Sequence, residues 1–149
     1  MIDLNKALFW DIETHAVVDW DKLSPAIQKA FVNHYYDSQS YSSPEEHYNE
    51  IAGLHAEFSH VICVSFGYIH PSTRELILFS TYGKDEVKIL NDCTKIFNKF
   101  QDGGYFLVDY NGTTCDRPYL SKRYVINRLE VPDFINNYGV KPWEDSHID

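Results

Sequence analysis

A short apolar segment near the start of the chain ends in two acidic residues. Residues 7–12 read Ala-Leu-Phe-Trp-Asp-Ile, the pattern of a buried strand that delivers polar groups at its C-terminal end. Asp11 and Glu13 are two residues apart, and side chains alternate along a strand, so both carboxylates point to the same face. Such a pair repels unless a hard cation such as Mg²⁺ neutralises it, which makes it a candidate metal site. The alternative is a strand end that turns polar as it reaches solvent.

A second acidic segment follows another apolar run. Residues 111–116 read Asn-Gly-Thr-Thr-Cys-Asp and lie between a predicted strand and a predicted helix. If that strand neighbours the first one, Asp116 comes up beside Asp11 and Glu13 and three carboxylates converge. The alternative is that Asp116 caps the following helix and that Asn111-Gly112 is only a turn.

The remaining pattern predicts a mixed α/β fold, with antiparallel and parallel strands in one sheet flanked by helices. A polar and aromatic segment at about 19–57 interrupts it as a helical insert. The predicted elements are strand 7–12, helices 24–36 and 43–55, a hairpin of strands 61–69 and 75–80, helix 84–101, strand 105–108, helix 117–129, and the opening of a strand at 147–149.

Composition and charge limit the class of protein. Three cysteines without a C-x-x-C pair indicate neither a disulfide framework nor a zinc ribbon, and no apolar run approaches a membrane span, so we expect a cytoplasmic protein without a membrane partner. The net charge of −9 argues against a protein that holds a long duplex through many phosphate contacts. The negative charge is compatible with an enzyme that binds only a few terminal nucleotides, with bound cations supplying the positive charge.

Together, the two acidic segments resemble a known family. Residues 8–14, Leu-Phe-Trp-Asp-Ile-Glu-Thr, resemble the first motif of the DEDD group of 3′→5′ exonucleases. The Asp-Ile-Glu-Thr sequence within them is similar to that of the proofreading domains of B-family DNA polymerases. Residues 111–116 are similar to the second motif. Residues 52–68 and 141–144 resemble stand-alone predicted exonucleases related to those domains. The resemblance spans nearly the whole chain and implies an RNase H-like fold.

The resemblance also implies a chemistry, the two-metal hydrolysis of a terminal phosphodiester with Mg²⁺ or Mn²⁺. In the family's scheme Asp11 bridges both metals, Glu13 holds the one that activates water, and Asp116 supports the second. Thr14, Asn111 and Cys115 would contact the substrate, which is expected to be the 3′ end of single-stranded DNA, or of RNA. The sequence gives no indication of the oligomeric state.

This sequence departs from the family in two places. Cys115 stands where the family has Phe or Tyr, which puts the substrate side of the site in doubt. The third motif, Tyr-x-x-x-Asp or His-x-x-x-x-Asp on a later helix, is absent. Residues Tyr105 to Asp109 fit the Tyr-x-x-x-Asp pattern, but they precede the second motif and lie on a predicted strand, so they are not the third motif. We therefore expect a C-terminally truncated domain over 1–149 that lacks the rest of its last strand and the third-motif helix, and that turns over little by itself.

The sequence is also compatible with two other functions, and it leaves the role of three basic side chains undecided. A non-catalytic RNase H-like module could bind nucleic acid or a protein, whereas a phosphatase with a nucleophilic Asp11 would need Asp in place of Glu13. Basic side chains on the last predicted helix could meet a nucleic-acid backbone or form a solvated face. These side chains are Arg117, Lys122 and Arg123.

Overall fold

The computed structural model describes residues 3–136 and 147–149. Segment 141–144, part of the family resemblance, therefore lies outside the described residues. The chain divides into two compact units, one formed by Met1–Glu13 and Val61–Asp149 and the other by Thr14–His60.

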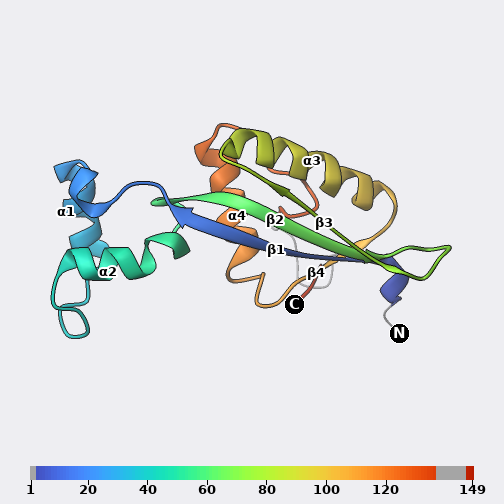
Figure 1. Cartoon of the computed structure of the whole chain (residues 1–149), viewed down its shortest axis with the longest axis horizontal. Coiled ribbons are helices and arrows are strands. Elements are labelled where there is room, and N and C mark those ends of the chain that lie inside the picture. Colours follow the sequence, from blue (N-terminus) through green and yellow to red (C-terminus); the bar gives the residue numbers. More distant parts are fainter. Residues whose placement is uncertain (1–2, 137–146) are drawn as a thin grey trace. The chain divides into compact units, whose positions relative to one another are not determined.

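The first unit is built on a mixed five-stranded sheet (Figure 1). In spatial order, its strands are β3 (Leu76–Tyr82), β2 (Ser59–Ile69), β1 (Ala7–Ala16), β4 (Phe106–Val108) and β5 (His147–Ile148). β1, β4 and β5 run parallel, and β2 and β3 form the predicted antiparallel hairpin. The strand opening expected at residue 147 is β5. A mixed sheet flanked by helices confirms the predicted RNase H-like fold class.

Two helices of this unit follow the sheet strands in sequence. α3 (Glu86–Asp102) and α4 (Asp116–Ile126) agree with the predicted helices to within a few residues. The buried apolar residues of α3 recur at helical spacing and are Ile89, Leu90, Cys93, Phe97 and Phe100. Val87, which the apolar spacing also placed on this stripe, is instead 42% exposed. A short 3-10 turn, η1 (Leu4–Lys6), precedes β1.

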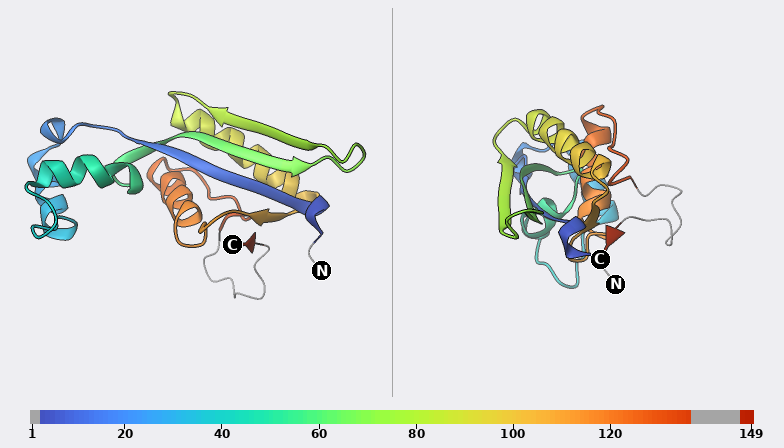
Figure 2. Two further views of the ribbon diagram at one scale, coloured as in Figure 1. Left: turned by 60° about the horizontal axis from the view of Figure 1, so that its bottom comes forward. Right: turned by 90° about the vertical axis from the view of Figure 1, so that its right-hand side faces the viewer.

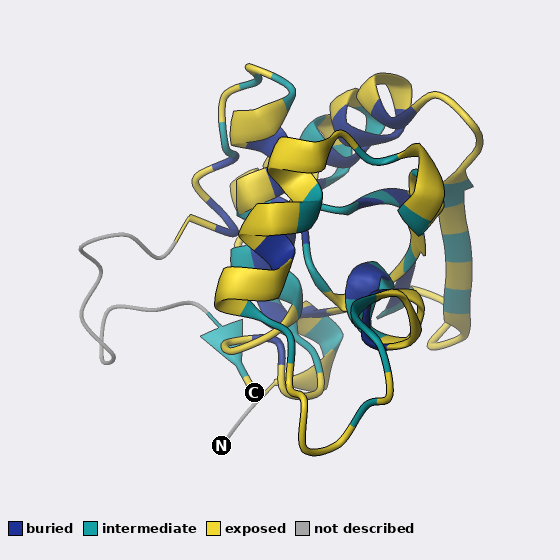
Figure 3. Cartoon of the chain, turned by 90° about the vertical axis from the view of Figure 1, so that its left-hand side faces the viewer, coloured by how far each residue is buried: buried dark blue, intermediate teal, exposed yellow. Residues whose placement is uncertain are grey.

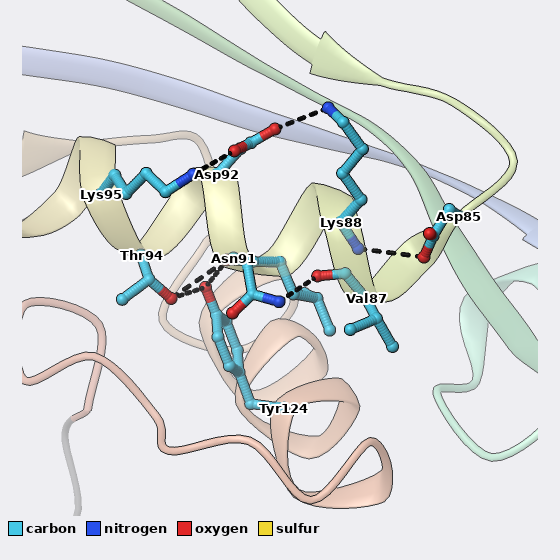
Figure 4. A network of polar contacts seen from close by, with 9 residues as sticks. Asp85, Val87, Lys88, Asn91, Asp92, Thr94, Lys95 and Tyr124 are labelled. Carbon is cyan, nitrogen blue, oxygen red and sulfur yellow. Dashed lines mark hydrogen bonds and ion pairs between the residues drawn. The ribbon is translucent and has the colours of Figure 1, made fainter.

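Local polar contacts fix the start of α3 and its packing against α4 (Figure 4). The carboxylate of Asp85 accepts a hydrogen bond from the backbone N–H of Lys88 at 3.0 Å, which caps the helix. The Tyr124 hydroxyl on α4 donates to the Leu90 carbonyl on α3 at 2.7 Å. Within the described ranges, no helix is long and apolar enough to cross a membrane.

α3 covers one face of the strands β1, β2 and β3 (Figure 2). The ring of Phe97 on α3 meets Trp10 of β1 edge to face with ring centres 5.5 Å apart, and Phe66 of β2 at 5.6 Å. Trp10 and Phe66 are buried. Because side chains alternate along a strand, the residues next to them point to the opposite face.

The second unit is a small helical cluster. Its helices α1 (Pro25–His34) and α2 (Pro44–Ile51) begin as predicted, with the Ser24 and Ser43 hydroxyls accepting hydrogen bonds from backbone N–H groups in the first turn. Two 3-10 turns, η2 (Trp20–Lys22) and η3 (Ala52–Leu54), complete it. Its core forms around Phe31, Tyr48 and Ala52, with further aromatic rings packed on them.

Candidate functional site

Three acidic residues lie where the parallel strands end. The pairing of β1 with β4 ends at Phe9, and Asp11 lies two residues further along β1. Asp109 directly follows β4, and Asp149 directly follows β5. Since parallel strands present their carboxyl ends at one edge of a sheet, the three carboxylates share that edge.

A fourth carboxylate, Asp116, joins this edge from α4. It is the first residue of the helix and is half-buried. Burial raises its pKa to about 6, and the negative charges of Asp11, Asp109 and Asp149 add to the rise. The charge of Asp11 therefore acts on Asp116, although the two residues come from motifs that are far apart in the sequence.

The first acidic pair has the geometry expected from strand alternation. Asp11 and Glu13 are both exposed, whereas Trp10 is 4% exposed and Ile12 is partly buried. The two carboxylates thus lie on the same side of β1. Within residues 3–136 and 147–149, however, no three His, Cys, Asp or Glu side chains are arranged to hold a metal ion.

The loop of the second motif is folded back on itself and tied to the end of β5. Asn111 has a positive φ of 58°, a conformation that Asn tolerates better than most residues. The Asp149 carboxylate accepts hydrogen bonds from the backbone N–H groups of Asn111 at 2.7 Å and Thr113 at 3.2 Å. The side-chain amide of Asn111 in turn donates to the Cys115 sulfur at 3.2 Å. Asp149 therefore orders the loop that leads into Asp116.

The buried side chains of Asp109 and His147 pair with each other, and Asp109 also contacts the same loop. Nε2 of His147 lies 2.6 Å from Oδ2 of Asp109, with the two side chains only 3% and 1% exposed. The other Asp109 oxygen accepts a hydrogen bond from the Gly112 N–H at 3.1 Å. Asp109 thus links β4, β5 and the second motif.

The remaining predicted site residues are placed as follows. Cys115 is exposed and occupies the N-cap position of α4, without a side-chain cap hydrogen bond. The alternative in which Asp116 caps this helix does not hold, because Asp116 is already the first helical residue. In the second unit, the Thr14 hydroxyl donates to the Gly53 carbonyl at 2.6 Å.

Sequence reasoning missed two carboxylates and misjudged two arginines. Asp109 and Asp149 follow parallel strands, the same signal that singled out Asp11, and could have been found in this way. Arg117 and Arg123 are neither a solvated face nor a phosphate-binding surface, because they are 1% and 4% exposed. A helix of such modest apolar periodicity gave no sign of this burial.

The raised pKa of Asp116 predicts a pH-dependent stability. Its folded-state pKa of about 6 lies above the ordinary value of 3.8, so the stability present below pH about 4 is lost as the pH rises through about 6. Asp116→Asn removes the repelling charge and should stabilise the metal-free protein near pH about 8 by about 1 kcal/mol, a value reduced for the partial exposure of the group. Urea unfolding near pH about 8 and about 4 would measure the gain and its disappearance.

The exposed Asp133 offers a matched control for this substitution. Asp133→Asn should change the unfolding free energy by less than about 0.5 kcal/mol at either pH. A loss of stability in Asp116→Asn at neutral pH would show that the carboxylate is held by favourable partners instead of being repelled.

Comparison with known proteins adds little beyond this geometry. No protein-family profile and no curated protein matches the sequence. Among solved structures, the family B DNA polymerase of the hyperthermophilic archaeon Pyrobaculum calidifontis is similar with a TM-score of 0.42 and 18% sequence identity. The match covers 83% of this chain and 11% of the polymerase chain.

Proposed function

We propose that the chain is a metal-dependent 3′→5′ exonuclease that hydrolyses the terminal phosphodiester at the 3′ end of single-stranded DNA, or of RNA. One observation supports this most strongly. Asp11 lies just beyond the part of β1 that pairs with β4, Asp116 begins the helix after β4, and the charge of Asp11 adds to the rise in the pKa of Asp116 that burial causes. Natural folds keep repelling carboxylates together where a function requires them.

The chemistry of the donor atoms fits Mg²⁺ or Mn²⁺. Carboxylate oxygens are the ligands that these hard cations prefer, and a cation would relieve the repulsion that adds to the burial-driven rise in the pKa of Asp116. Asp11, Glu13 and Asp116 would hold the ions, which supply Lewis acidity and lower the pKa of a coordinated water. The side chains of Asn111 and Cys115 would contact the terminal nucleotide.

The protein's own contribution is positioning. Asp11 is held in the strand β1, and the loop before Asp116 is held by the hydrogen bonds that its backbone N–H groups donate to the Asp149 carboxylate. Fixed carboxylates need no reorganisation when a phosphodiester approaches. The net charge of −9 keeps affinity for nucleic acid low unless cations are present.

A second candidate function is a non-catalytic module that binds single-stranded nucleic acid. It is favoured by the finding that, in the part of the chain that the structure describes, no three side chains are arranged to hold a metal ion. For the same reason we expect turnover by these 149 residues alone to be slow. Binding that depends on metal is therefore a more sensitive test than rate.

The experiment measures binding and shortening of a 5′-labelled single-stranded oligonucleotide with Mg²⁺, with Mn²⁺ and with chelator. We expect tighter binding with metal, and slow removal of nucleotides from the 3′ end. Asp11→Asn should lower the metal-dependent rate by about 100-fold or more, as the loss of one electrostatic group at a reaction centre commonly does. Fluorescence anisotropy and gel analysis of the products would follow both.

Asp133→Asn serves again as the control, since it removes an exposed acid outside the candidate site. It should leave binding and cleavage unchanged. Binding that is equally tight with chelator, together with no shortening, would favour the binding module over the exonuclease. Shortening that persists in Asp11→Asn would contradict the assignment of the site.

A further inference from the structure

The face of the sheet opposite α3 carries exposed apolar side chains. Phe9 of β1 is 36% exposed, and Leu76 and Leu78 of β3 are 60% and 72% exposed. The alternation of exposed and half-buried residues along β3 is visible in Figure 3. Clustered apolar side chains on a sheet face mark a binding surface more often than isolated ones do.

These side chains surround a hollow with a volume of about 400 Å³. β1, β2 and β3 all line it, and the side chains and backbone used in the argument belong to Phe9, Asp11, Ser65, Gly67, Leu76 and Leu78. This volume lies within the range of about 300–1,000 Å³ that is typical of small-ligand sites. The hollow is therefore large enough for one nucleobase with its sugar.

The glycine on β2 shapes the floor of the hollow. Gly67 pairs with Leu78 of the neighbouring strand. A Cβ atom added at Gly67 would lie 2.9 Å from Cδ2 of Leu78, closer than real Cβ contacts allow. The absence of a side chain at position 67 lets Leu78 lie across β2 and form an apolar wall.

One residue belongs to both the hollow and the candidate site. Asp11 lines the hollow, and its charge acts on Asp116 in the acidic cluster. The apolar surface thus continues directly into the site proposed to hold the cleaved phosphodiester. A nucleotide whose phosphate lies at Asp11 has its base within reach of Phe9.

From this geometry we propose that the hollow receives the base of the 3′-terminal nucleotide, an inference that rests on the proposed function. Bases have apolar faces that stack on aromatic and aliphatic side chains whatever their sequence. The Ser65 hydroxyl, which lies 3.0 Å from the Ser80 hydroxyl, offers a polar contact at the edge. A second copy of the chain fits this face poorly, because it would bring together carboxylates of two molecules that each carry a net charge of −9.

The test compares two labelled oligothymidylates, one with a normal 3′ terminus and one whose 3′-terminal residue is abasic. Binding is measured by anisotropy in Ca²⁺, which occupies oxygen sites but supports little hydrolysis. The protein should bind the normal end about tenfold more tightly, the effect of one stacked base. Leu78→Ser should bring the ratio of the two affinities close to one.

Leu54→Ser is the matched control, because Leu54 is 74% exposed, like Leu78 at 72%, but does not line the hollow. It should preserve the tenfold preference. The circular dichroism spectra of Leu78→Ser and Leu54→Ser should match that of the unmodified protein.

Equal binding of both oligonucleotides by the unmodified protein, with metal-dependent binding intact, would overturn this inference and leave the proposed function standing. Metal-independent binding of both would overturn the proposed function and this inference together. A stable dimer that Leu78→Ser dissociates would also overturn the inference, since a second copy would then cover the face.

Discussion

Arg123→Ala is expected to lower the free energy of unfolding by about 3–5 kcal/mol, because it leaves a buried carboxylate without its partner. Glu86, the first residue of α3, accepts hydrogen bonds from Arg123 Nε on α4 and from the Val61 N–H on β2, both at 2.8 Å. Asn127 donates to the same carboxylate at 2.8 Å. The side chains of Glu86 and Arg123 are each 5% exposed, so water cannot replace the lost partner.

The protonation of Glu86 gives this prediction a pH signature. Burial acts to raise the pKa of Glu86, but the hydrogen bonds from Arg123, Val61 and Asn127 and the charge of Arg123 together lower it below its usual value. The stability gained from the ionised carboxylate is therefore present at neutral pH and is lost as the pH falls through the folded-state pKa. The difference between Arg123→Ala and the unmodified protein should shrink in acid.

The neighbouring Lys122 provides the control, because it lies on the same helix and is exposed. Lys122→Ala should change stability by less than about 0.5 kcal/mol. Urea unfolding of the two variants measures the difference directly. A loss below about 1 kcal/mol for Arg123→Ala would show that the ion pair does not hold α3, α4 and β2 together.

Gly112→Ala should be similarly damaging, although it adds only one methyl group. The new Cβ atom would lie 2.1 Å from Cγ of Asp109. The Asp109 carboxylate cannot simply turn away, because it is buried, bonded to His147 and bonded to the Gly112 N–H. We expect a loss of about 3 kcal/mol or more, because the clash displaces a buried carboxylate from both of its hydrogen-bond partners, and a disordered second motif.

Thermal unfolding and metal-dependent binding of single-stranded DNA would both report the Gly112→Ala effect. Gly53→Ala is the matched control, since its added Cβ would find its nearest neighbour at 3.9 Å. It should be neutral or slightly stabilising. A Gly112→Ala protein as stable as Gly53→Ala would mean that Asp109 and His147 are not tightly paired.

Much of the fold follows from local sequence signals. The Ser-Pro pairs before α1 and α2 set the starts of both helices, and the apolar spacing predicted most of the buried face of α3, with Val87 as the exception. The hairpin came from two apolar runs around the turn at His70. These features depend on residues within a few positions of one another.

Features that depend on contacts between residues far apart in the sequence could not be predicted from local sequence signals. Arg123 is buried because Glu86, 37 residues away in the chain, neutralises it. β1 extends to Ala16, beyond the apolar run at 7–12 that predicted it, since strand pairing continues after the side chains turn polar. The meeting of Asp11 with Asp116 required the assumption that β1 and β4 are neighbours, which their parallel pairing supports.

The most direct test of the convergent carboxylates is an NMR titration of the aspartate carboxyl carbons with and without Mg²⁺. We predict that Asp116 titrates at about 6 in the metal-free protein, that Asp11→Asn lowers this pKa, and that Mg²⁺ lowers it further. An Asp116 pKa near 3.8 that responds to neither Asp11→Asn nor Mg²⁺ would contradict a shared cation site.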